Sequence, residues 1–188
     1  MKKKNKLLIV GAFPPTKRMV YGGIARSSEI LINSKSFSRF QITKFDSSQI
    51  SNPPPNIIIR SFLAIIRLIK FILTIITVRP NAVLVFCADG ASAIEKGVMI
   101  FISRIFSTKG YIFPRAGNLI VQVKKSKTML WVIKTLFSNA TIFLCQGNQW
   151  RKFAINSLKI NPEMTEIISN WSASNDLISL GDRRKINK

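Results

Sequence analysis

Near its start the chain reads Lys6-Leu7-Leu8-Ile9-Val10-Gly11-Ala12-Phe13-Pro14-Pro15, crosses a short basic stretch, and reaches Gly22-Gly23-Ile24-Ala25-Arg26. The apolar run is typical of a buried strand, and the paired glycines lead into a helix. A helix N-terminus presents backbone N–H groups to which an anion can bind. A second interpretation stays open, in which Gly22 and Gly23 only form a turn with positive φ. The spacing differs from the G-x-G-x-x-G fingerprint of dinucleotide sites, so a ligand is expected deeper in a cleft.

Composition indicates one globular domain with a strong positive charge. The chain has 188 residues, of which 47% are hydrophobic, enough for a single core. Lys and Arg number 29 against 8 Asp and Glu, a net charge of +21. Such a field favours an anionic partner: a nucleic acid, an anionic membrane or a phosphorylated substrate. A solvated basic surface without a specific partner is the alternative. No nucleic-acid-binding motif is present, so we expect no nucleic acid partner.

Histidine is absent from the chain, and cysteine occurs twice. The commonest general base and metal ligand is therefore missing, and we expect neither a metal site nor a bound cofactor. Cys87 and Cys145 each end an apolar run, which predicts reduced core thiols in a cytoplasmic protein. The N-terminal apolar run is too short for the core of a signal peptide.

Strand-like and helix-like segments alternate along the chain, the pattern of βαβ units. The predicted fold is α/β, a Rossmann-like three-layer sandwich with a mostly parallel sheet of about six strands. Strands are expected near 6–11, 39–45, 82–87, 109–114, 141–145 and 164–169, and helices near 23–35, 57–77, 94–106, 126–138 and 148–159. Residues 1–170 are expected to form this domain, and residues 171–188 a linker-like basic tail.

Local signals predict where the helices begin. Ser92 and Glu95 have the spacing of a capping box for the third helix, which also explains Glu95 better than catalysis does. Ser126 and Asn148 are suitable N-caps for the last two helices. The Asn52–Asn56 segment, rich in proline, predicts an extended stop before the long helix.

The long helix at 57–78 combines apolar residues with a cationic stripe. Arg60, Arg67 and Lys70 recur at helical spacing, followed by Thr74 and Thr77, so they share one face. One interpretation is a helix that covers the sheet, with this stripe toward solvent. The other is a peripheral helix whose basic residues face an anionic membrane. Three cations make the segment a poor membrane span.

Several motifs together resemble the opening half of family-4 glycosyltransferases, whose fold is GT-B. After the glycine loop at Gly22 and Gly23, the matching segments are Arg79-Pro80-Asn81-Ala82-Val83-Leu84-Val85, Phe113-Pro114-Arg115-Ala116-Gly117-Asn118, Gln146-Gly147-Asn148-Gln149-Trp150-Arg151 and Ile167-Ile168-Ser169-Asn170-Trp171. The resemblance covers residues 6–176. It implies an N-terminal domain that holds the acceptor, with a nucleotide-sugar donor held mainly by a second domain across a cleft.

The resemblance also implies roles for individual residues. Gly22 and Gly23 would approach the phosphates of the donor, and Arg26 would face the same anion or merely solvent. Arg115 stands where many family members carry a histidine and, with Gly117 and Asn118, would bind the acceptor. An arginine cannot accept a proton near neutral pH but can clamp a phosphate or carboxylate.

Asp89 is the candidate catalytic residue that would orient or deprotonate the acceptor hydroxyl, because it follows a strand at the carboxyl edge where α/β sheets bind ligands. An Asp-Gly turn is the alternative for Asp89. Helix dipoles and basic side chains can neutralise a departing nucleoside diphosphate, so the implied chemistry needs no metal.

The expected function is therefore transfer of a sugar from a nucleotide-sugar co-substrate to a glycan or lipid-linked acceptor, in polysaccharide or cell-envelope assembly. The donor domain of the family is missing from this sequence, so the chain is expected to be a truncated product, a fragment or one subunit of a split enzyme, and inactive alone. The alternative is a non-catalytic basic module that docks on anionic membranes or a partner chain. We expect a cytoplasmic location, peripheral at the inner face of the plasma membrane.

Overall fold

The computed structural model describes residues 4–13, 23–48 and 56–169. In chain order its elements are β1 (Lys6–Gly11), α1 (Gly23–Ile32), the 3-10 turn η1 (Lys35–Phe37), β2 (Gln41–Asp46), α2 (Ile57–Val78), β3 (Ala82–Cys87), α3 (Gly90–Ile105), β4 (Lys109–Pro114), α4 (Asn118–Lys125), α5 (Lys127–Phe137), β5 (Ile142–Cys145), α6 (Asn148–Asn156), the 3-10 turn η2 (Pro162–Met164) and β6 (Thr165–Ile167).

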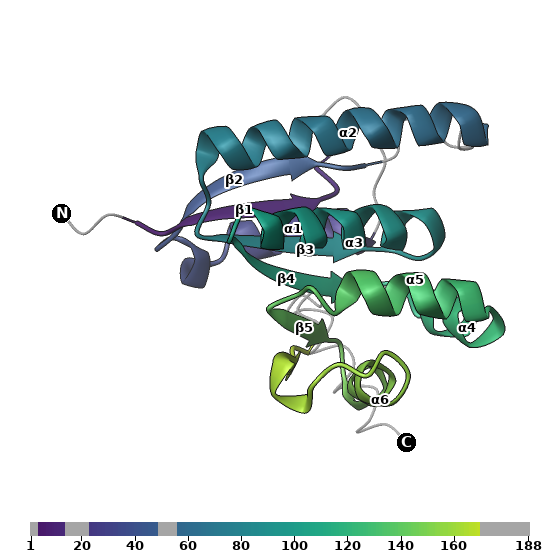
Figure 1. Ribbon diagram of the computed structural model, residues 1–188. Coiled ribbons are helices and arrows are strands. Elements are labelled where there is room, and N and C mark those ends of the chain that lie inside the picture. The colour runs from purple at the N-terminus through teal and green to yellow at the C-terminus, as the bar shows by residue number, and fades with distance from the viewer. Residues whose placement is uncertain (1–3, 14–22, 49–55, 170–188) are drawn as a thin grey trace, which may run out of the picture.

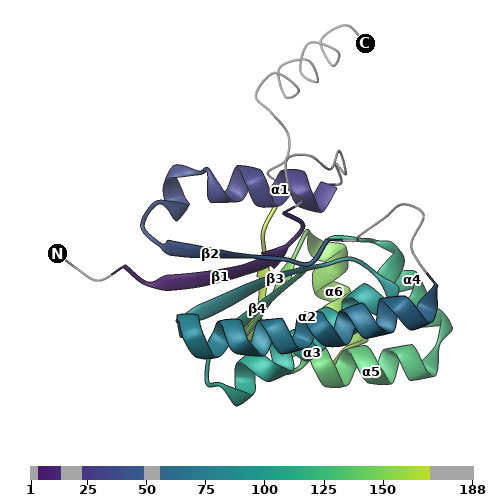
Figure 2. The same cartoon turned by 90° about the horizontal axis from the view of Figure 1, so that it is seen from above.

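The described residues form a single six-stranded sheet in the order β2-β1-β3-β4-β5-β6, and every pairing in it is parallel. Helices flank both faces: α1 lies on one, and α2, α3 and α5 lie on the other (Figure 2). The predicted α/β fold with a Rossmann-like parallel sheet is thus confirmed. Because all strands run the same way, their carboxyl ends meet at one edge.

Alternate side chains of the central strands serve two separate cores. Leu8 and Val10 of β1 join the larger core, which also contains buried residues of helices α2 to α6. Leu7 and Ile9 face the opposite way, toward the core under α1. Strands covered on both faces must be apolar throughout, which explains the continuous runs seen in the sequence.

Three expectations about helix starts are wrong. No helix was predicted between 114 and 126, yet α4 forms there, because Leu119, Ile120 and Val123 recur at helical spacing and are buried. The capping box also fails, because α3 begins at Gly90, ahead of Ser92. Of the other predicted caps, Ser126 accepts a hydrogen bond from the Met129 N–H. Asn148 is not an N-cap: α6 begins at Asn148 itself, and Gly147 occupies the N-cap position.

Glu95 instead joins α3 to α2. Its carboxylate accepts two hydrogen bonds from Arg67, at 2.7 and 3.0 Å, and the Lys96 ammonium lies 3.5 Å away. The hydrogen bonds to Glu95 raise the pKa of Arg67 above its ordinary value. Burial lowers the pKa of Lys96, although the neighbouring Glu95 opposes this. Arg67 therefore points toward α3 and does not belong to an outward-facing cationic stripe.

Replacing Glu95 by Gln tests this cluster. We expect Glu95→Gln to lower the free energy of unfolding by about 3 kcal/mol, because Arg67 and the buried Lys96 lose their anion. The matched control is Glu29→Gln, which removes an exposed partner of Arg26 and is expected to cost less than about 1 kcal/mol. Equal, small losses in urea unfolding of the two variants would contradict the role of Glu95.

Gly97 allows α3 and α5 to pack closely. A Cβ atom added there would lie 2.7 Å from the Leu136 Cβ and 3.2 Å from the Phe137 ring, closer than packed atoms approach. The nearest atom, the Leu136 Cβ, is bonded directly to the backbone of α5. Helices α3 and α5 would therefore have to separate to make room for the added methyl group.

We expect Gly97→Ala to destabilise the protein by about 2 kcal/mol, as overpacking of a core does. Gly117→Ala is the control. Among the described residues nothing lies within 4 Å of a Cβ at Gly117, and its φ of −59° suits alanine. Thermal unfolding of both variants checks this, and a Gly97→Ala protein as stable as the control would show that the helices can shift without cost.

Candidate functional site

The site lies at the carboxyl edge of the sheet, where the chain changes direction. From β1 the chain passes through α1 to β2 on one side, then returns through α2 to β3 on the other side. The position between the carboxyl ends of β1 and β3 is thus a topological switch point, where open α/β sheets usually bind ligands. Asp89 and Arg115 follow the neighbouring strands β3 and β4 at this edge.

Asp89 occupies the N-cap position of α3 and is joined to α4 by two amides. Asn118 donates to its Oδ2 at 2.5 Å, and Gln122 donates to the same atom at 3.5 Å. Gln122 also accepts from the Gly90 N–H at 2.8 Å. The structure therefore brings together Asp89 and Asn118, which were predicted for catalysis and acceptor binding, and it orients the carboxylate. Gly90 has a φ of +56°, a conformation that suits the Asp-Gly turn alternative equally.

Arg115 connects β4 to the start of α1. Its Nη2 donates to the Ser27 Oγ at 2.9 Å, and that hydroxyl donates to the Gly23 carbonyl at 2.7 Å. The guanidinium lies over the Phe113 ring, 5.0 Å from its centroid. Partial burial lowers the pKa of Arg115 from its ordinary value, but a guanidinium stays protonated near neutral pH.

Gly11 is what allows α1 to lie against the sheet here. A Cβ at this position would come within 2.9 Å of the Ser28 Oγ and 3.3 Å of the Phe86 ring. Without a side chain at Gly11, the first turns of α1 reach the carboxyl end of β1 and place Ser27 within reach of Arg115.

The remaining predicted residues have different positions. Arg26 pairs with Glu29 at 3.2 Å on the exposed surface of α1, each side chain being about 60% exposed, so it faces solvent. Gly117 is exposed at the start of α4. Gly22, the second half of the glycine pair, lies outside the described residues, as do the tail 171–188 and the final Asn170-Trp171 motif.

Asp46 is a further residue of this edge that the sequence did not suggest. One of its oxygens accepts from the backbone N–H groups of Phe13 and Ser48, both at 2.9 Å, and the other accepts from the Ser48 hydroxyl. Asp46 therefore joins the segments that follow β1 and β2. The sequence signal that could have identified Asp46 is an aspartate directly after a predicted strand. Gln122 had no such signal, because the residues that its side chain contacts, Asp89 and Gly90, lie more than 30 positions away in the sequence.

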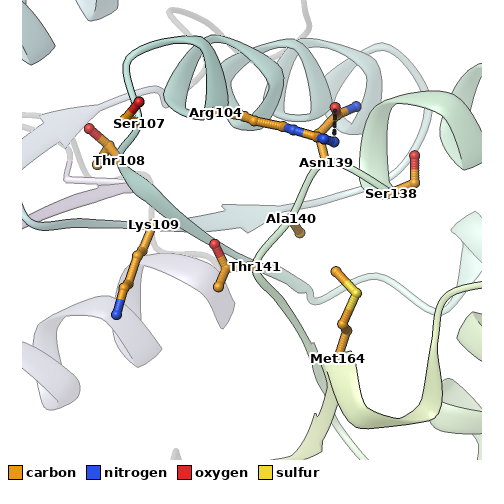
Figure 3. A pocket seen from close by; sticks show the side chains of 9 residues that line it. All are labelled: Arg104, Ser107, Thr108, Lys109, Ser138, Asn139, Ala140, Thr141 and Met164. Atoms are coloured by element: carbon orange, nitrogen blue, oxygen red, sulfur yellow. Dashed lines mark hydrogen bonds between the residues drawn. The ribbon is translucent and has the colours of Figure 1, made fainter.

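The structure also contains a hollow at the opposite edge. It has a volume of about 360 Å³ and lies at the amino ends of β4 and β5 (Figure 3). The residues that line it are Arg104, Ser107, Thr108, Lys109, Ser138, Asn139, Ala140, Thr141 and Met164. Arg104 donates to the Asn139 side chain across it at 3.1 Å. Ligands of parallel sheets bind at the carboxyl edge, so we assign the site to that edge.

The two thiols lie beneath the carboxyl edge but are sealed from it. Cys87 and Cys145 are buried free cysteines at the ends of β3 and β5, as predicted. Burial raises the pKa of Cys87 to about 12 and that of Cys145 to about 11. Neither thiol forms a thiolate near neutral pH, so neither is a nucleophile of this site.

We expect a thiol reagent such as Ellman's reagent to modify neither cysteine in the folded protein at pH 8, and both in denaturant. A Ser138→Cys variant, with its thiol at an exposed position, is the control and should react within minutes. Reaction of one native thiol at the rate of the control would show that the edge opens to solvent.

No protein-family model matches the chain, and no curated protein matches its sequence. Among solved structures, the crystal structure of Anabaena Alr3699/HepE in complex with UDP-glucose is similar at a TM-score of 0.47 and 14% identity. The match covers 97% of this chain and 50% of the other, so this chain spans about half the length of that protein.

Proposed function

We propose that this domain is the acceptor-side half of a glycosyltransferase, which moves a sugar from a nucleotide sugar to a glycan or lipid-linked acceptor in polysaccharide or cell-envelope assembly. One observation carries the proposal: an oriented carboxylate and a fixed guanidinium follow adjacent strands at the switch point of the sheet, beside the start of α1. The motif resemblance to family-4 glycosyltransferases supports the same function.

In this proposal Asp89 orients or deprotonates the acceptor hydroxyl. Its Oδ2 is held by Asn118 and Gln122, so the carboxylate is positioned before the acceptor arrives, as general-base catalysis requires. Asn118, exposed at the start of α4, and the adjoining Gly117 would contact the acceptor.

Arg115 would bind an anionic group of the acceptor, such as the pyrophosphate of a lipid carrier, because a guanidinium binds phosphate oxygens bidentately. The N-terminus of α1 at Gly23 would approach the donor phosphates with its backbone N–H groups; the same role is proposed for Gly22. A second domain or a partner chain would supply most of the donor site, so the isolated chain would not transfer sugar.

Binding of inorganic pyrophosphate, followed by amide shifts in 15N NMR spectra, tests the site. We expect shifts at the start of α1 and near Arg115, and Arg115→Gln should weaken binding about tenfold, the loss of one charge-assisted hydrogen-bonding group. UDP-glucose, the nucleotide sugar in the Anabaena crystal, is the corresponding donor probe and should shift the start of α1.

Arg104→Gln is the matched control, because it removes the same charge at the opposite edge of the sheet. It should bind pyrophosphate as the unchanged chain does. Equal weakening by both variants would show that the anion responds only to the net positive charge, and shifts spread over both edges would overturn the site.

The alternative function, a non-catalytic module that docks on an anionic membrane or a partner chain, also has a specific observation in its favour. The face of α2 that points away from the sheet is apolar and exposed. A cytoplasmic location, peripheral at the inner face of the plasma membrane, fits either function and remains part of the proposal.

A further inference from the structure

The outward face of α2 carries a continuous apolar stripe. Ile58, Phe62, Ile65, Ile69, Leu73 and Ile76 recur at spacings of three or four, which places them in one row along the helix, and 47–76% of each residue is exposed. The opposite face holds the buried Phe71 and Ile75. Covering helices of water-soluble α/β domains are polar on the outward face, so this stripe needs a partner.

The cations of α2 do not lie in that stripe. Arg60 and Arg67 fall in the same helical row as the buried Phe71 and Ile75, eleven and four positions before Phe71, and Arg67 is bound to Glu95. Lys70 flanks the stripe and is exposed. The interpretation in which Arg60, Arg67 and Lys70 face the membrane is therefore wrong for Arg67, whose guanidinium is bound to Glu95. Arg60 and Lys70 are exposed, and the outward stripe itself is apolar.

Neighbouring helices of the same layer also carry exposed apolar residues. Figures 1 and 2 show α2, α3 and α5 side by side on one face of the sheet. On α3, Phe101 and Ile105 are 44% and 62% exposed. On α5, Trp131 is 67% exposed, and Lys127 and Lys134 lie one turn to either side. An exposed tryptophan between lysines is typical of surfaces at the boundary between lipid and water.

We propose that this layer docks on an anionic lipid bilayer, with the apolar stripe of α2 lying in the boundary between headgroups and acyl chains and Trp131 at its margin. The net charge of +21 complements an anionic membrane, since each basic residue near such a surface adds to the attraction. A second copy of the chain is disfavoured for the same reason, because two such charges repel.

A transmembrane role for α2 conflicts with its packing. By length and hydropathy the helix could cross a bilayer. However, Phe71 and Ile75 lie in the domain core, with Leu68 and Ile72 packed against it, and the Arg67–Glu95 ion pair ties α2 to α3. Crossing would expose this core and break the pair, whereas lying flat uses the outward face and leaves the inner face packed.

The orientation has a consequence for the candidate site. α2 starts at the carboxyl edge of the sheet, the edge that holds Asp89 and Arg115 (Figure 1). Its first residues, Ile57 and Ile58, are the most exposed large apolar residues of the helix. A bilayer on this face would lie beside that edge, where a lipid-linked acceptor would present its headgroup. The docking surface deepens the alternative function and holds whether or not the domain transfers sugar.

Vesicle flotation of the 188-residue chain tests the proposal, with phosphatidylcholine vesicles that contain 30% phosphatidylglycerol or none. We expect binding to the anionic vesicles, and Phe62→Ser/Ile69→Ser should reduce it at least tenfold. The control is Ile167→Ser/Ile168→Ser, which alters two partly exposed residues at the β6 end of the sheet, away from α2, and should bind as the unchanged chain does. Circular dichroism checks that both variants are folded.

A Phe62→Trp variant gives a second readout that does not depend on loss of binding. The fluorescence emission of this tryptophan should shift to shorter wavelength when anionic vesicles are added. In a separate experiment, washing with alkaline carbonate should release the bound protein from the vesicles. Resistance to carbonate would overturn the proposal in favour of a span, and equal binding to both kinds of vesicle would overturn the role of charge. Sedimentation as a dimer that Phe62→Ser/Ile69→Ser abolishes, without vesicle binding, would make a second copy the occupant. Pyrophosphate binding is measured separately, so the failure of one proposal leaves the other testable.

Discussion

Parallel pairing of β1 with β3 is the constraint on which the rest of the structure depends. It aligns Leu7 with Ala82 and Val10 with Val85, segments that are 75 positions apart and can meet only if the intervening chain crosses over the sheet. The crossovers cover both faces, so the central strands must be apolar throughout. The same pairing collects the carboxyl ends of the strands at one edge, and the reversal of direction beside β1 places a topological switch point at the edge that carries Asp89 and Arg115.

A few carboxylates join separate segments of this strongly cationic chain. Only 8 acidic residues face 29 basic ones, and three of them join separate segments: Glu95 joins α3 to α2, Asp46 the segments after β1 and β2, and Asp89 the start of α3 to α4. Each accepts several hydrogen bonds, so its loss leaves more than one donor unpaired. These three acidic residues are therefore engaged in contacts within the domain, while the excess of basic residues would attract an anionic partner.

The two faces of α2 connect stability to the proposed location. Phe71, Ile75 and the Arg67–Glu95 pair fix the inner face, so the outward apolar stripe is presented by a rigid helix. A preorganised surface docks without the cost of ordering a segment. Because α2 starts at the edge that carries the candidate site, membrane docking and acceptor binding would share one orientation of the domain.

The sequence by itself determined the fold class, the six strands and the buried thiols, because an apolar run of strand length between helical segments is a local pattern. It also suggested Asp89, because that residue follows a strand at the carboxyl edge, whereas Asn118 and Arg115 came from the resemblance to family-4 glycosyltransferases. Only the tertiary structure decided that Glu95 binds Arg67 rather than capping α3, that Gln122 and Asp46 belong to the edge, and that Arg67 of α2 points inward. These outcomes depend on which elements pack together, and periodicity defines the faces of a helix without saying which face the core will cover.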